Sequence, residues 1–155
     1  MRTCSAVISV LIALTAVSTI ASQTPERIDE LLDADSLDRG EAAYIAAASA
    51  GVVEADASND AALDALVERG FSSDRAEEPQ VAARLDEFSH MSMLAHDISG
   101  GFMYSLFPGP RYAYRELRHE GVFSRGGDPA TQVSGAYALR TVGRLLSITE
   151  ARQEQ

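Results

Sequence analysis

The stretch DRGEAAYIAAASAG, residues 38–51, marks both ends of a helix in its own residues. Asp38 is followed three positions later by Glu41, which is the spacing of a capping box that satisfies free backbone N–H groups at a helix start. Gly51 closes the stretch, and glycine readily takes the left-handed backbone conformation that ends many helices. The alanine-rich interior favours helix. The stretch therefore predicts a helix with defined ends.

Similar helical patterns follow along most of the chain. Apolar residues recur at helical spacing in segments 24–32, 59–70, 84–97, 111–121 and 134–148, and Gly70 and Gly121 end two of these segments. In the last segment Leu139, Val142 and Leu146 share one face, which we expect to be buried. No stretch alternates apolar and polar residues convincingly. The sequence therefore predicts a mainly α protein.

The predicted helices recur in a fixed order. A short helix ends in glycine and an apolar residue, a polar loop with a proline follows, and a longer helix comes next. The starts of the longer helices align at Leu37, Ala83 and Val133, 46 and 50 positions apart. A repeat of this length predicts units that bury their apolar faces on one another. We expect three units, at about 24–51, 59–100 and 111–149, around a shared core.

This organisation resembles an array of S-layer homology repeats. That family has three repeats, and the longer helix of each usually opens with a Thr-Arg-Ala-Glu-like tetrad. Here LDRGEAAY matches through Asp38, Arg39, Gly40 and Glu41. ARLDEF keeps the glutamate but has leucine in the arginine position, and VSGAYALRTVGRLL keeps only the apolar pattern. The resemblance covers roughly residues 24–149.

The resemblance implies a module that binds the cell envelope. Its relatives hold cell-wall-linked polysaccharide in grooves between repeats, and the tetrad arginine meets an anionic sugar group. A guanidinium fork suits a carboxylate, so the resemblance gives this role to Arg39. Glu41 is a second candidate for binding, but its spacing from Asp38 also allows a purely structural role in the capping box.

The first 21 residues have the pattern of an export signal. Arg2 precedes an apolar stretch at residues 5–17, and small residues at Thr19 and Ala21 are typical of a cleavage site. The apolar stretch is shorter than the roughly 20 residues of a membrane-spanning helix. We expect a cleaved signal peptide, with retention as an anchor as the alternative. One domain, residues 22–155, remains, in the periplasm or on the surface of a bacterium.

Charge is distributed unevenly along the chain, whose net charge is −10. Residues 22–100 hold 5 arginines and 18 acidic residues, whereas residues 101–155 hold 7 arginines and 5 acidic residues. The acidic part argues against nucleic acid as a partner. The partner that the resemblance implies is an envelope polysaccharide, and a larger envelope protein is the alternative.

Five of the ten aromatic residues fall in residues 102–114, around the expected connector 101–110. One hypothesis is that apolar residues of this stretch plug the core between units: Phe102, Met103, Leu106 and Phe107. The other is that tyrosines and arginines form a basic aromatic binding surface: Tyr104, Arg111, Tyr112, Tyr114, Arg115 and Arg118. Tyrosine rings stack on sugars, and arginines pair with carboxylates.

Patterns for catalysis, metals or cofactors are weak. His90 and His96 are six positions apart and do not converge on a helix, and the only cysteine, Cys4, lies in the expected signal peptide. No serine lies in a Gly-x-Ser-x-Gly turn, and no glycine loop that could hold a phosphate is present. We therefore expect a non-catalytic binding or anchoring module without a cofactor. A small envelope glycan hydrolase or accessory enzyme is the alternative.

Overall fold

The computed structural model describes residues 23–71, 78–123 and 127–153. These residues are mainly helical, as predicted. The helices are α1 (Gln23–Asp33), α2 (Arg39–Ser49), α3 (Asn59–Glu68), α5 (Leu85–Ala95), α6 (Phe102–Leu106), α7 (Pro110–His119) and α8 (Gly135–Gln153). Within the described ranges there is no strand, only two isolated antiparallel bridges. The expected signal peptide, 1–21, lies outside these ranges.

The predicted helix ends are confirmed. Asp38 caps α2, and the glycines that follow α2, α3 and α7 have positive φ angles, from 69° to 103°. Glycine adopts this left-handed conformation without the strain that a Cβ atom would cause. The helix boundaries were therefore encoded locally.

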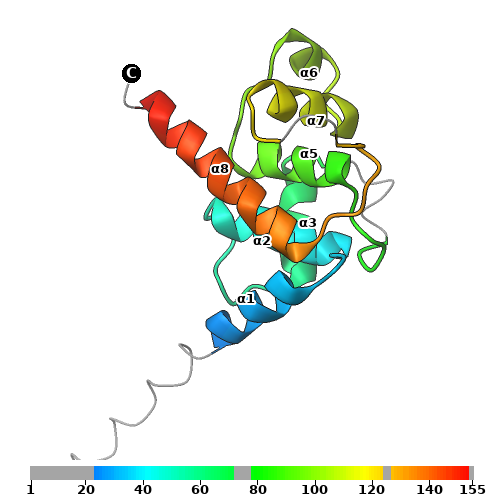
Figure 1. Ribbon diagram of the computed structural model, residues 1–155, viewed down its shortest axis with the longest axis vertical. Coiled ribbons are helices and arrows are strands. Elements are labelled where there is room, and N and C mark those ends of the chain that lie inside the picture. Colours follow the sequence, from blue (N-terminus) through cyan, green and yellow to red (C-terminus); the bar gives the residue numbers. More distant parts are fainter. Residues whose placement is uncertain (1–22, 72–77, 124–126, 154–155) are drawn as a thin grey trace, which may run out of the picture.

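The core lies around α2 and α5, near the middle of the molecule in Figure 1. Helix α5 packs on α7 and on α2, α2 packs on α3, and α8 packs on α1 and α2. Nearly every residue of α5 is buried, including Phe88, Met91 and Met93. Residues from distant segments complete this core, among them Leu37, Leu66, Leu117, Val133 and Leu145.

Three backbone hydrogen bonds form a closed ring in this core. The amide of Leu37 donates to the carbonyl of Val133 (2.8 Å), the amide of Val133 to that of Ala83 (3.0 Å), and the amide of Ala83 to that of Leu37 (2.9 Å). All three residues are buried. They are also the three positions that align as helix starts in the sequence. The ring thus joins three segments that are far apart along the chain.

The start of each longer helix is bonded to a neighbouring loop. The first amides of α2, at Arg39 and Gly40, donate to the carbonyls of Val81 and Pro79. The first amides of α5, at Leu85 and Asp86, donate to those of Thr131 and Pro129 in the same way. The amide of Gly135, at the start of α8, donates to Ala34. Helix starts have amides without partners inside the helix, and these loops supply the partners.

The start of α8 lies so close to α1 that only glycine fits. A Cβ atom added to Gly135 would overlap the carbonyl oxygen of Leu31. Gly135 occupies the position in the third segment that corresponds to Arg39 in the first. Close packing against the last turn of α1 therefore explains why this position has no side chain.

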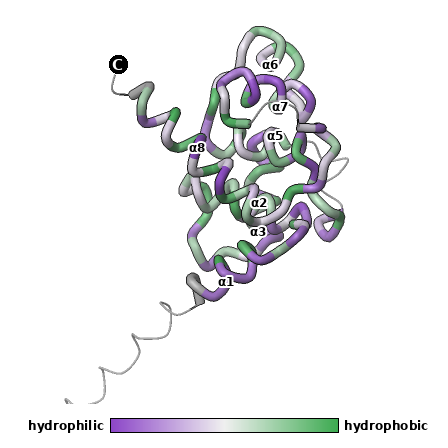
Figure 2. Tube along the Cα trace, viewed as in Figure 1, coloured by the Kyte–Doolittle hydropathy of each residue, from purple (hydrophilic) through white to green (hydrophobic). Residues whose placement is uncertain are grey.

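Helix α6 corrects the first hypothesis for the aromatic stretch. Four side chains expected to plug the core are exposed instead: Phe102, Met103, Leu106 and Phe107. The segment expected to be a connector is partly helical, and its one buried side chain is Tyr104. In Figures 1 and 2, α6 lies at the opposite end of the folded chain from α1. A five-residue helix has room to bury only one of its faces.

The buried face of α8 is also rotated from the predicted one. Val142 is buried as expected and Leu139 is half-buried, but Leu146 is exposed and its neighbour Leu145 is buried. None of the described helices is both long enough and apolar enough to cross a membrane.

Candidate functional site

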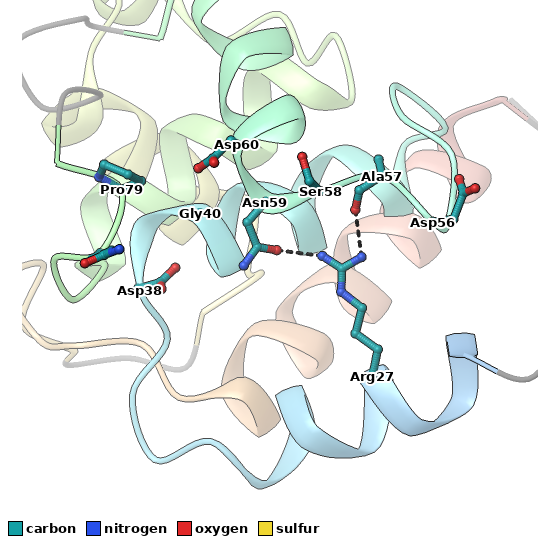
Figure 3. Close-up of a pocket in the computed structure, with 10 residues that line it drawn as sticks. Arg27, Asp38, Gly40, Asp56, Ala57, Ser58, Asn59, Asp60 and Pro79 are labelled. Atoms are coloured by element: carbon teal, nitrogen blue, oxygen red, sulfur yellow. Dashed lines mark hydrogen bonds between the residues drawn. The ribbon is translucent and has the colours of Figure 1, made fainter.

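A groove of about 480 Å³ lies where α1, the start of α2, the loop before α3 and the loop before α5 meet. Figure 3 shows the side chains that surround it. Its volume falls within the range of small-ligand sites. The lining is mostly polar and consists of Arg27, Asp38, Gly40, Asp56, Ala57, Ser58, Asn59, Asp60, Pro79 and Gln80.

Arg27 is fixed in one position by three partners. Its guanidinium donates to the carbonyl of Ala57 (2.7 Å) and to the side-chain oxygen of Asn59 (2.6 Å), as Figure 3 shows. It also lies 3.4 Å from the centre of the Tyr44 ring, a cation–π contact. Tyr44 in turn donates to the carbonyl of Ala55 (2.6 Å). These contacts hold α1 against the loop before α3 and make this wall of the groove rigid.

The groove carries more negative than positive charge. Three carboxylates line it, at Asp38, Asp56 and Asp60, and they face a single guanidinium that already has hydrogen-bond acceptors. Carboxylates and amide oxygens accept hydrogen bonds from hydroxyl groups. In the parts of the chain that the structure describes, no three metal-binding side chains are grouped as a metal site would require. This chemistry suits a neutral, hydroxyl-rich ligand better than an anion.

Arg39 lies inside the protein rather than on a binding surface. Its guanidinium pairs with the carboxylate of Glu87, with N–O distances of 3.3 and 3.4 Å, and donates to the carbonyl of Glu78 (3.2 Å). Arg39 is 6% exposed and Glu87 is fully buried. An anionic sugar would have to displace Glu87 to reach the guanidinium. The residue from the first segment thus holds the second segment in place.

Glu41 has the structural role that its spacing allowed. Its carboxylate accepts a hydrogen bond from the Asp38 amide (2.9 Å), while the Asp38 carboxylate accepts one from the Glu41 amide (2.7 Å). This is the predicted capping box. Asp38 therefore caps α2 and lines the groove at the same time.

The expected basic aromatic surface forms only in part: the guanidinium of Arg118 lies 5.7 Å from the centre of the Tyr114 ring, but two of the three tyrosines are buried. Tyr104 and Tyr114 are buried, and Tyr114 donates to the carbonyl of Gly127 and stacks on Phe123. Tyr112 is half-buried and stacks on Phe107. The exposed members of the set are Arg111, Arg115 and Arg118. The tyrosines therefore serve packing, while the arginines remain on the surface of α7.

A buried pair of polar side chains connects α5 to α6. The hydroxyl of Tyr104 lies 3.2 Å from Nδ1 of His90, and the His90 ring also packs beside Phe71. Burial lowers the pKa of His90 and raises the pKa of Tyr104. Both groups are therefore neutral at pH 7, and together they hold α6 on the body of the protein.

One serine–histidine contact lies between α2 and the residue that follows α5. The hydroxyl of Ser49 lies 3.1 Å from Nε2 of His96 and 2.8 Å from the carbonyl oxygen of Ala46. Burial also lowers the pKa of His96. This pair acts as a connection between α2 and the end of α5.

Sequence reasoning singled out Asp38 and Gly40 for other reasons and did not identify the remaining residues of the groove. Asn59 and Asp60 are recognisable only as a helix start, and Gln80 belongs to an unremarkable polar loop. Arg27 carried one usable signal, because it is the only basic residue between positions 22 and 38. The comparisons with known proteins add no assignment, because no family model, curated protein or solved structure matches the chain.

Proposed function

We propose that this chain is a non-catalytic, exported module that binds polysaccharide of the bacterial cell envelope. The module has three helix–loop–helix units of the S-layer homology type. The ligand lies in the groove between the first unit and the second.

The observation that carries the proposal is the ring of backbone bonds. Three units related by an approximate threefold axis require equivalent contacts from the first to the second, the second to the third and the third to the first. The bonds between Leu37, Ala83 and Val133 have this cyclic pattern, and these positions were aligned from the sequence alone. The loop carbonyls bonded to the starts of α2 and α5 repeat at matching positions. This equivalence supports three units around one core.

The three units differ at the tetrad position for reasons of packing. Arg39 in the first unit pairs with Glu87 in the second. The second unit has Leu85 there, which is buried, and the third has Gly135, which must avoid Leu31. The position is used for contacts between units in each case. Loss of the family tetrad is thus compatible with a retained three-unit arrangement.

The groove has the chemistry of a site for sugar hydroxyls. It brings Asp38 and Gly40 of the first unit beside Pro79 and Gln80 of the second. Its carboxylates and amides can accept hydrogen bonds from hydroxyls, and Gln80 and Asn59 also have amide groups that donate. Because the Arg27 guanidinium is already held by Ala57 and Asn59, this side of the groove is in place before a ligand binds. Preorganised groups lose less entropy when the ligand arrives.

The test is sedimentation of the purified protein with bacterial cell-wall sacculi. One sample of sacculi retains its linked polysaccharide, and a second has been stripped of it with hydrofluoric acid. The protein should sediment with the first and remain in solution with the second. Combined substitution Asp56→Asn and Gln80→Ala should weaken binding at least tenfold, because the first replaces a charged acceptor by a neutral amide and the second removes an amide from the groove.

The matched control is Asp35→Asn combined with Gln132→Ala, because both residues are exposed in loops that do not line the groove. This variant should bind as the parent does. Equal loss in both variants would mean that overall charge, and not the groove, drives retention. Equal binding to stripped sacculi would reject the polysaccharide as ligand, and release of soluble sugar fragments would reject a non-catalytic role.

A further inference from the structure

Helix α6 presents an unusual concentration of exposed apolar side chains, which we call the α6 tip. The exposed fractions are 78% for Phe102, 46% for Met103, 55% for Leu106 and 56% for Phe107. Single exposed apolar residues are common on protein surfaces, but contiguous groups often mark a contact site. Here four of the six residues from 102 to 107 are involved.

The α6 tip is held against the body of the protein by packing and hydrogen bonds. The Tyr104 ring is buried against α5 and packs so close to Gly100 that a Cβ atom there would lie 2.6 Å from the ring. The Ser105 hydroxyl donates to the backbone at the start of α6, and Phe107 stacks on Tyr112 at 6.4 Å. Helix α6 is therefore attached to the described core, and its four apolar side chains are exposed in that attached position.

Arginines outnumber acidic residues on the neighbouring helix α7, which also carries Glu116, whose carboxylate lies beside Gly101 at the start of α6. No acidic residue occurs from Ile98 to Arg115, in a chain that contains 23 acidic residues. Two exposed arginines, Arg111 and Arg115, lie one turn apart on α7, which starts four residues after α6 ends. An apolar projection beside cations complements a surface that is apolar inside and anionic outside.

We propose that the α6 tip inserts into the surface of a membrane that contains acidic phospholipid. The apolar side chains enter the boundary between headgroups and acyl chains, and Arg111 and Arg115 pair with the phosphates. Aromatic residues favour this boundary, and amphipathic elements bind it through apolar burial together with attraction to anionic lipids. Juxtamembrane arginines add electrostatic affinity for an anionic leaflet.

The size and shape of the tip favour a lipid surface over a protein partner. Its exposed apolar area is on the order of 400 Å², whereas a stable protein interface needs about 800 Å² from each partner. The tip also projects at one end of the molecule, opposite α1 (Figure 1). A bilayer accommodates such a projection without a complementary groove.

The test uses a tryptophan as a local reporter, because the chain has none of its own. Phe102→Trp places the reporter on the tip, and Ile28→Trp places it on an exposed position of α1 at the other end. Each full-length variant is mixed with vesicles of phosphatidylcholine alone, or of phosphatidylcholine and phosphatidylglycerol in equal parts. The emission of the Phe102→Trp variant should shift to shorter wavelength with the anionic vesicles, while that of Ile28→Trp should not change.

The arginines are tested in the Phe102→Trp background. Arg111→Gln combined with Arg115→Gln should raise the anionic lipid concentration needed for half of the shift about tenfold. Arg140→Gln combined with Arg144→Gln on α8 removes the same charge at the same spacing and should have little effect.

Three results would overturn the proposal. The first is no emission change with either vesicle, and the second is the same change in both reporters, which would indicate contact through another part of the chain. The third is a shift in Phe102→Trp that depends on protein concentration without vesicles, because a second copy of the chain would then cover the tip. An equal shift with neutral vesicles would overturn the role of the arginines.

Discussion

Two regions of the molecule differ in which side chains they bury. One region is formed by the starts of α2 and α5, and the other is the α6 tip. At the helix starts, the charged side chains of Arg39 and Glu87 are inside the protein. At the tip, large apolar side chains such as Phe102 are in solvent. In these two regions, whether a side chain is buried depends on where it lies between packed helices and on which partners it finds there, and not on its hydrophobicity.

The buried charges are stable where they lie because their polar atoms have partners. The Arg39 guanidinium bonds to the Glu87 carboxylate and to the Glu78 carbonyl, and the Glu87 carboxylate also accepts the Arg84 amide (3.0 Å). A buried ion pair needs such additional bonds to offset the loss of hydration. Helix α6 instead has one side chain, Tyr104, that reaches the core. The side chains of Phe102, Met103 and Leu106 are exposed.

The largest expected effect is at the junction between α1 and α8. Gly135→Ala should prevent folding or cost several kcal/mol in the free energy of unfolding, because the methyl group would overlap the Leu31 carbonyl. Gly143→Ala, on the same helix, has open space around it and should stabilise the protein by up to about 1 kcal/mol. Chemical denaturation measures both. A mild effect of Gly135→Ala would show that α8 does not approach α1 as closely as the Gly135–Leu31 contact requires.

The buried ion pair gives the next largest effect. Glu87→Gln leaves the Arg39 charge without its buried counter-charge and should lower the free energy of unfolding by about 3–5 kcal/mol. Asp97→Asn removes one partner of the exposed Arg69–Asp97 pair and should cost about 0–1 kcal/mol. If denaturation midpoints for the two variants coincide, the Arg39–Glu87 pair is not structurally important.

Acid should destabilise the protein through its buried histidines. Burial lowers the pKa of His90 and of His96 below the ordinary value of 6.5. Between the lowered values and 6.5, the unfolded chain binds more protons than the folded chain. The free energy of unfolding should therefore fall as the pH is lowered through that window, and recover as it is raised.

The variant His90→Gln separates this effect from other acid effects. It should show a weaker dependence of stability on pH than the parent, measured by denaturation at a series of pH values. If the free energy of unfolding of His90→Gln depends on pH as it does in the parent, His90 does not contribute to the acid effect.

The smallest effect is expected at the tip. Phe107→Ala should cost less than about 1 kcal/mol, because the ring is mostly in solvent. Phe88→Ala, at a fully buried position on α5, should cost about 3–5 kcal/mol. Thermal or chemical unfolding measures both. If the two variants lose the same free energy of unfolding, Phe107 is a core residue and the exposed position described here is wrong.

The sequence predicted features that depend on short-range signals. The capping box of Asp38 and Glu41 and the glycines after α2, α3 and α7 lie within one turn of what they determine. The alignment of Leu37, Ala83 and Val133 used only the order of such signals, yet these residues meet through hydrogen bonds. A mainly α fold follows directly from these patterns.

Features set by contacts between distant segments could not be predicted in this way. The direction that α6 faces depends on where α5 and α7 lie, so hydrophobicity alone placed Phe102 inside. Helix α8 packs on α1 and α2 with Leu145 buried and Leu146 exposed, and the residue spacing within α8 does not reveal where those two helices lie. The groove joins residues from four segments, and the one motif among them, the capping box at Asp38, indicates a helix start and not a binding site.

Hydrogen exchange at the three ring amides tests the central claim, that three units close on one another in a single core. We predict that the amides of Leu37, Ala83 and Val133 exchange only by global unfolding, each with the free energy measured by denaturation. The Ser105 amide of α6, bonded to Gly101 in a helix of five residues, should exchange far faster. Exchange of any ring amide at a clearly lower free energy than the other two would contradict a closed ring.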